Sequence, residues 1–132
     1  VYLDVRGADG TVRLVNAGHM PPVRIGAAGY HDLPKGDMAL GMMPGAAYTE
    51  RTEMLGAGDM LLVYSDGLTE ALNAAGEFYD ETRLRQLLPG LNALAAREAG
   101  QRIVASVDAF IGDTRPYDDL SLVVLKRTAP PA

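Results

Sequence analysis

The sequence predicts an α+β fold in which antiparallel sheets carry helices on one face. Three observations lead to this prediction. Short segments with alternating apolar and polar residues fill the first half of the chain, and Gly- and Pro-rich turns separate them. The second half shows helical periodicity. The chain then closes with one more apolar strand, and this order of elements is typical of layered α+β domains.

The strands of the first half follow from alternation and turn signals. Residues 1–6 and 11–15 alternate on either side of the turn signal at residues 7–10, which predicts a hairpin. Further strands are expected at residues 23–25, 30–33 and 48–54. Residues 34–47 contain several Gly and Pro and are expected to form a loop. Residues 60–64 form a continuous apolar run between turn signals, which predicts a central buried strand.

The second half is expected to be helical before it returns to the sheet. Helices are expected over residues 68–72, 81–88 and 92–111. Asp80 is a natural cap for the second of these helices. The last strand, residues 120–125, is expected beside residues 60–64, because both are apolar and both have an acidic residue at one end. The domain is therefore predicted to cover residues 1–127, with a frayed tail at 128–132.

Composition narrows the classes of function. The chain has 132 residues, of which 48% are hydrophobic and 22% charged, a balance that is typical of a globular domain. The absence of Cys excludes a disulfide framework and a thiolate metal site. A net charge of −5 without a Lys/Arg cluster argues against a nucleic-acid partner. No signal peptide is visible and no apolar stretch approaches about 18 residues, so we expect no membrane span and a cytoplasmic protein.

Two acidic sites at strand ends are candidates for chemistry. Asp66 directly follows the buried strand, and Gly67 then allows the backbone to turn sharply, which would hold a carboxylate at the rim of a sheet. Asp118 and Asp119 stand just before the last strand, where side chains alternate in direction, so at most one of them faces a given site. Each pattern alone is more typical of a solvated turn than of a functional site.

The two acidic sites gain weight when they are considered together. If the two strands are neighbours, Asp66 and Asp118 can converge on one hard divalent cation such as Mg2+ or Mn2+, with their carboxylates about 5–6 Å apart. His19, in the loop before Pro21, is a candidate ligand or general acid, although a lone loop His is more often solvated. The pair Met42 and Met43 is expected to fill gaps in packing.

Three strings in this order resemble those of the PPM (PP2C-type) protein phosphatases, and within them the bacterial SpoIIE/RsbU-like branch. They are Asn16-Ala-Gly-His-Met-Pro-Pro22, Leu61-Leu-Val-Tyr-Ser-Asp-Gly-Leu-Thr-Glu-Ala71 and Asp118-Asp-Leu-Ser-Leu122. The resemblance implies an α-β-β-α sandwich with two Mn2+ or Mg2+ ions at one end. By this resemblance, Asp66 and Asp118 would be ligands of the second metal ion, and Asp119 would occupy the motif position next to Asp118.

The remaining positions are accessory in this resemblance. They are Asn16, Gly67 and His19, and His19 stands where many relatives have an Asp that sometimes binds a third metal ion. The resemblance implies attack of a metal-activated water on phosphorus without a covalent phosphoenzyme. Phosphoserine or phosphothreonine residues of an anti-anti-sigma factor are the implied substrates.

One part of the family pattern is not found in this sequence. Relatives carry an upstream stretch whose Asp bridges both metal ions, and no such motif occurs here. We therefore expect the C-terminal part of a phosphatase domain, holding at most one metal ion and completed by an upstream half or sensor domain. Alone, it is expected to hydrolyse phosphate esters poorly and to self-associate. The alternative is a non-catalytic, phosphatase-like regulatory or protein-binding module.

Overall fold

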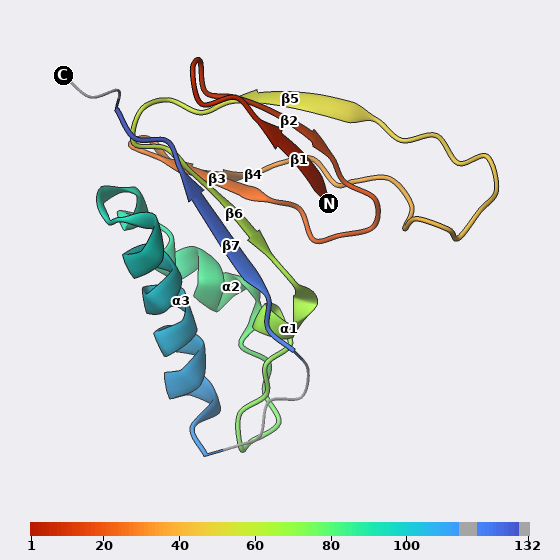
Figure 1. Ribbon diagram of the computed structural model, residues 1–132. Coiled ribbons are helices and arrows are strands. Elements are labelled where there is room, and N and C mark those ends of the chain that lie inside the picture. Colours follow the sequence, from red (N-terminus) through yellow and green to blue (C-terminus); the bar gives the residue numbers. More distant parts are fainter. Residues whose placement is uncertain (114–118, 130–132) are drawn as a thin grey trace.

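The computed structural model describes residues 1–113 and 119–129 (Figure 1). Its strands are Tyr2–Val5 (β1), Thr11–Val15 (β2), Val23–Gly26 (β3), Gly29–Asp32 (β4), Glu50–Met54 (β5), Met60–Tyr64 (β6) and Leu122–Lys126 (β7). Its helices are Asp66–Thr69 (α1), Asp80–Leu87 (α2) and Ala96–Ile111 (α3), with a 3-10 turn at Leu91–Ala93 (η1). None of the helices in these residues is long and apolar enough to cross a membrane.

The strands form two antiparallel sheets. One sheet has the order β1-β2-β5, and the other has the order β4-β3-β6-β7. The hairpin expected from the first alternating segments is present, with Leu3 opposite Leu14. The last strand lies beside β6, as expected, and the pair of strands ends where Tyr64 faces Leu122. Because β6 and β7 are antiparallel, the C-terminal end of β6 meets the N-terminal end of β7.

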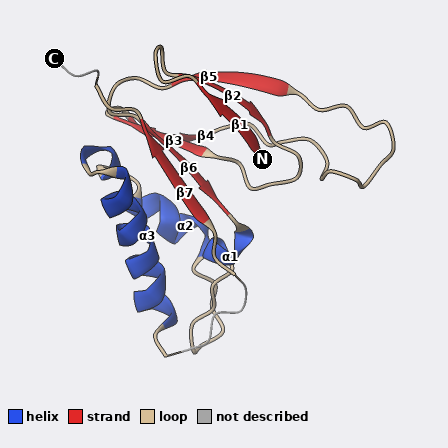
Figure 2. Cartoon of the chain, viewed as in Figure 1, coloured by secondary structure: helices blue, strands red, loops and turns tan. Residues whose placement is uncertain are grey.

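The sheets and helices stack in layers (Figure 2). The two sheets pack against each other, and the helices cover the outer face of the four-stranded sheet, so the prediction of an α+β fold with helices on one face is confirmed. The position of β6 between two cores explains why its sequence is continuously apolar. Leu61 and Val63 belong to the core between the sheets, whereas Met60, Leu62 and Tyr64 belong to the core under the helices.

The long helix expected over residues 92–111 is interrupted in the structure. It is divided into η1 and α3 by an extended backbone at Leu94 and Ala95. Lys126, on β7, donates hydrogen bonds to the carbonyl oxygens of Asn92 (2.8 Å) and Leu94 (2.6 Å). These carbonyl groups are therefore bound by a side chain from the sheet instead of by the N–H groups of a continuous helix.

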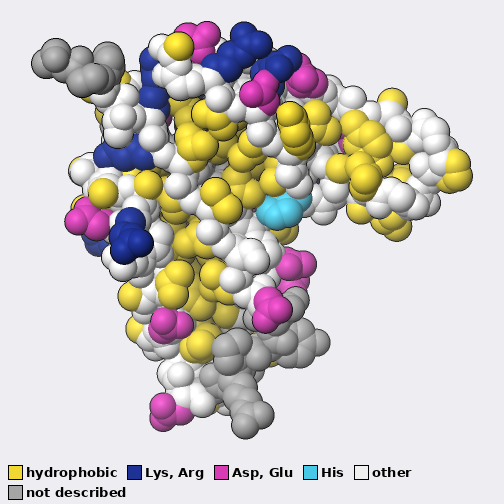
Figure 3. Space-filling view, in the orientation of Figure 1, with side chains coloured by type: hydrophobic (Ala, Val, Ile, Leu, Met, Phe, Trp, Pro, Cys, Tyr) yellow, Lys and Arg dark blue, Asp and Glu magenta, His cyan; other side chains and the backbone are white. Residues whose placement is uncertain are grey.

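Two smaller expectations also change. The short helix after β6 covers Asp66–Thr69 instead of residues 68–72, because Ser65 is already extended and Asp66 begins the helix. Met42 and Met43 do not fill gaps in packing: their exposed fractions are 72% and 53%. They belong to the loop between β4 and β5, which projects from the body and bears apolar side chains on its surface (Figure 3). The two side chains are exposed because this loop extends away from the sheets (Figure 1).

Candidate functional site

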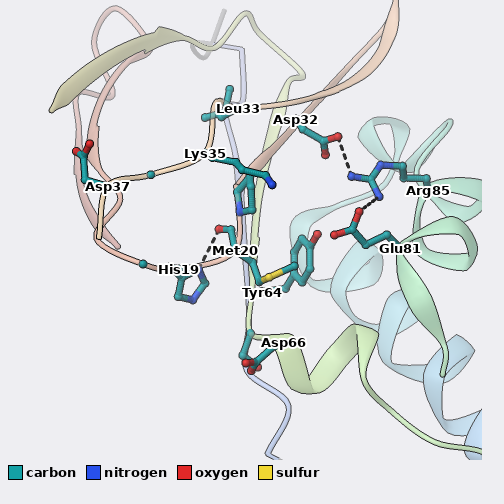
Figure 4. Close-up of a pocket in the computed structure, with 14 residues that line it drawn as sticks. His19, Met20, Asp32, Leu33, Lys35, Asp37, Tyr64, Asp66, Glu81 and Arg85 are labelled. Carbon is teal, nitrogen blue, oxygen red and sulfur yellow. Dashed lines mark hydrogen bonds and ion pairs between the residues drawn. The ribbon is translucent and has the colours of Figure 1, made fainter. Parts of the chain in front are cut away.

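A pocket of about 560 Å3 lies at the end of the sheets where β6 stops. Four separate parts of the chain line it: the turn at residues 18–21, the segment at residues 32–37, residues 64–66, and the first turns of α2 (Figure 4). The pocket contains two of the sequence-predicted side chains, His19 and Asp66. The two therefore share one pocket although 46 residues of sequence separate them (66 − 19 − 1).

Asp66 occupies the rim position that its sequence context predicted. Strand β6 ends at Tyr64, and the exposed Asp66 begins α1. Its Oδ1 accepts a hydrogen bond from the N–H of Gly67 at 3.0 Å, and its carbonyl oxygen accepts bonds from Thr69 and Glu70. A carboxylate has about four lone-pair sites, so this single side-chain hydrogen bond leaves most of the acceptor capacity of Asp66 available to a ligand.

Ser65 holds the end of β6 against the residues that lead into β7. Its N–H donates to the carbonyl oxygen of Ser121 at 3.0 Å, and its Oγ accepts from the N–H of Ser121 at 2.9 Å. The same hydroxyl donates to the carbonyl oxygen of Asp119 at 3.3 Å. The backbone next to Asp66 therefore lies beside Asp119. Asp118 lies outside the described residues, so the separation of the Asp66 and Asp118 carboxylates remains a prediction.

Asn16 builds the turn that carries His19. It is only 3% exposed; its Nδ2 donates to the carbonyl oxygen of His19 at 3.0 Å, and its Oδ1 accepts from the N–H of His19 at 2.9 Å. Its own carbonyl oxygen accepts from the N–H of Asp37 at 2.8 Å. Gly36 packs so closely that an added Cβ would clash with that oxygen. Asn16 is thus a scaffold residue that joins two walls of the pocket.

The sequence reasoning missed an ionic network on the opposite wall. Arg85 of α2 donates to Asp32 of β4 at 2.8 Å and to Glu81 at 2.6 Å. The hydrogen bond with Asp32 raises the pKa of the Arg85 guanidinium above its ordinary value, and the bond with Glu81 adds to this effect. Burial raises the pKa of the Tyr64 hydroxyl, and the negative charge of Glu81 raises it further. The i, i+4 spacing of Glu81 and Arg85 was visible in the sequence, but the contact with Asp32 was not.

Oxygen donors of the kind that a hard divalent cation prefers are present in this pocket, but they form an incomplete set. Asp66 offers an exposed carboxylate, and the carbonyl group of Asp119 is held nearby through Ser65. Within residues 1–113 and 119–129, no group of three or more His, Asp or Glu side chains is arranged to hold a metal ion. The oxygen donors of the described residues are therefore chemically suited to one side of a metal site, but they do not surround an ion.

Comparisons with known proteins identify the family of this chain. The sequence profile of the stage II sporulation protein E (SpoIIE) family matches residues 1–128. Protein IcfG of Synechocystis sp. is 30% identical over 91% of the chain, and the phosphoserine phosphatase RsbU of Bacillus subtilis is 30% identical over 74%. The chain spans only 19% and 29% of the length of these two relatives.

Solved structures show the same fold. The RsbU and RsbW domains of Rv1364c from Mycobacterium tuberculosis superpose with a TM-score of 0.71 at 25% identity, covering 98% of this chain and 36% of that one. The phosphatase domain of SpoIIE from Bacillus subtilis, presoaked in Mn, gives a TM-score of 0.75 at 18% identity, covering 99% of this chain and 56% of that one. From the profile match, the sequence identities and the shared fold, this chain belongs to the SpoIIE family of PPM (PP2C-type) phosphatases.

Proposed function

We propose that this chain forms part of the active site of a metal-dependent protein serine/threonine phosphatase. The observation that carries the proposal is the placement of Asp66: an exposed carboxylate at the rim of a pocket, beside the entrance to β7, in a chain of the SpoIIE family. A carboxylate on the rigid end of a central strand is well placed to keep a ligand in a fixed position.

The proposed metal ligands are Asp66 and Asp118, with Asp119 as a further candidate. A bound Mn2+ or Mg2+ ion would supply positive charge to the phosphoryl oxygens and lower the pKa of a bound water. The protein residues around it position these ligands: Ser65 holds the two strand ends together, and Gly67 anchors the Asp66 carboxylate through its N–H. His19 is a further candidate, as a metal ligand or a general acid, because it lines the same pocket and its Nδ1 lies 3.1 Å from the carbonyl oxygen of Met20.

The proposed substrate is a phosphoserine or phosphothreonine protein that regulates a sigma factor, such as an anti-anti-sigma factor. The support is the 30% identity to the phosphoserine phosphatase RsbU of Bacillus subtilis and the similarity to the RsbU domain of Rv1364c. Residues of the longer protein, an upstream half of the domain or a sensor domain, would supply the remaining metal ligands.

The proposal is tested by removing the two predicted ligands in the complete parent domain. We expect Asp66→Ala and Asp118→Ala each to reduce Mn2+-dependent hydrolysis of a phosphoserine protein by at least about a hundredfold, because losing a metal ligand costs several kcal/mol of transition-state stabilisation. Asp108→Ala is the matched control, since Asp108 is an exposed carboxylate of α3 that does not line the pocket. Turnover at the wild-type rate in either ligand variant, with the fold intact by circular dichroism, would contradict the assignment.

A second candidate function is a non-catalytic, phosphatase-like regulatory module. The observation that favours it is the incomplete set of metal-ligating side chains in the described part of the chain. The same experiment separates the two functions, because a regulatory module predicts no Mn2+-dependent turnover in the wild-type parent domain either.

A further inference from the structure

We propose that Lys35 binds the phosphoryl oxygens of the substrate in the pocket that contains Asp66. This inference rests on the proposed phosphatase function and adds a substrate-binding residue to it. Lys35 lines the pocket, and Figure 4 shows its amine extending into the space between Tyr64 and the Asp32–Arg85–Glu81 network.

The backbone that carries Lys35 is fixed on both sides. The preceding Leu33 is 2% exposed, and its N–H donates to the carbonyl oxygen of Pro22 at 2.8 Å. The following residues are tied to Asn16: the N–H of Asp37 donates to its carbonyl oxygen, and Gly36 packs against it without room for a Cβ. The Cα of Lys35 is therefore held between two anchors, although its side chain is exposed. A fixed backbone reduces the entropy lost when the side chain binds a ligand.

The other cation of the pocket, Arg85, and the carboxylates of Asp32, Glu81 and Asp37 are already engaged. Arg85 is bound by two carboxylates, those of Asp32 and Glu81. The carboxylate of Asp37 accepts a hydrogen bond from the N–H of Thr49 at 2.6 Å and points away from the pocket in Figure 4. Lys35 forms no ion pair or hydrogen bond through its ammonium group with any residue of the described chain. It is thus the pocket-lining cation that is available to an incoming anion.

The charge of the Asp32–Arg85–Glu81 network can be compared with that of a phosphoryl group. Asp32, Glu81 and Arg85 together carry a net charge of −1 (two carboxylates and one guanidinium). A phosphoryl dianion carries about two negative charges at neutral pH and offers several acceptor oxygens to a lysine ammonium. A substrate phosphoryl group in this pocket would therefore be a stronger partner for Lys35 than the network is.

The test uses the complete parent phosphatase domain and three variants. Lys35→Gln removes the charge at similar length, Lys35→Arg keeps it, and Arg102→Gln removes one positive charge from an exposed position of α3 outside the pocket. The measurements are KM and kcat for p-nitrophenyl phosphate in Mn2+, and the inhibition constant of inorganic phosphate. We expect Lys35→Gln to raise both KM and the inhibition constant by about tenfold, the loss of one charge-assisted hydrogen bond. Lys35→Arg should restore most of the binding, and Arg102→Gln should leave it unchanged.

A change of less than about threefold in Lys35→Gln would overturn the proposal. So would an effect confined to phosphopeptides with acidic neighbours of the phosphoserine, because Lys35 would then bind a substrate carboxylate.

A titration of the Mg2+-loaded domain with inorganic phosphate, followed by NMR, reports binding without turnover. Asp66-dependent turnover together with phosphate binding that is indifferent to Lys35 would leave the phosphatase function standing and remove this inference. Phosphate binding that depends on Lys35 in a domain without turnover would leave this inference standing and remove the phosphatase function.

Discussion

Replacing Asn16 with Ala should loosen the turn that carries His19 and destabilise the fold. The Asn16 side chain is almost fully buried and makes two hydrogen bonds, one to the N–H and one to the carbonyl oxygen of His19. A hydrogen bond contributes about 0.5–1.5 kcal/mol net to stability. Losing two should therefore lower the free energy of unfolding by about 1–3 kcal/mol. Urea denaturation of the parent domain, followed by circular dichroism, measures this change.

Two further variants define what the loss at Asn16 means. Asn92→Ala is the matched control, because the side chain of Asn92 makes no hydrogen bond within the described residues, and it should change the free energy of unfolding by less than about 0.5 kcal/mol. Gly36→Ala forces a Cβ against the Asn16 carbonyl group and damages the same junction. The double variant of Asn16 and Gly36 should then lose less stability than the two single losses added together. An Asn16→Ala variant as stable as Asn92→Ala, or fully additive losses, would refute this account of the junction.

Two other predictions concern a helix start and the isolated chain. The N–H of Arg83 donates a hydrogen bond to the Asp80 carboxylate and holds the pKa of that carboxyl below its ordinary value of 3.8. The charged carboxylate therefore contributes stability at pH values above 3.8. This contribution is lost as the pH falls through the depressed pKa. Asp80→Ala should therefore lower the urea midpoint at pH 7, and the difference from wild type should narrow at pH 3, whereas a difference independent of pH would disprove a role for the charge. The isolated 132-residue chain should show little p-nitrophenyl phosphate turnover in Mn2+ and should self-associate in light scattering, because β1 and β5 are sheet edges without a further strand in the described chain. Robust turnover by a strict monomer would show that the chain is sufficient by itself.

The sequence alone determined the class of fold and the pairing of its central strands. Residues 60–64 are apolar without interruption because β6 is covered by helices on one face and by the second sheet on the other. The apolar run after Ser121 has the same character, and it lies beside β6 as expected. The position of Asp66 was also predictable, since polar residues that follow a buried strand this closely have to lie at its end. These features depend on local periodicity, which the order of residues contains directly.

Only the tertiary structure decided which distant side chains share the pocket. Arg85 and Asp32 are 53 positions apart, and their ion pair depends on how α2 lies against β4. The interruption before α3 was likewise hidden from helical periodicity, because it depends on Lys126 reaching from β7 to two carbonyl groups. The anchored position of Lys35 follows from contacts of its neighbours with Pro22 and Asn16 in other segments. In each case the deciding contact joins elements that meet only when the layers pack, so no local pattern of residue types records it.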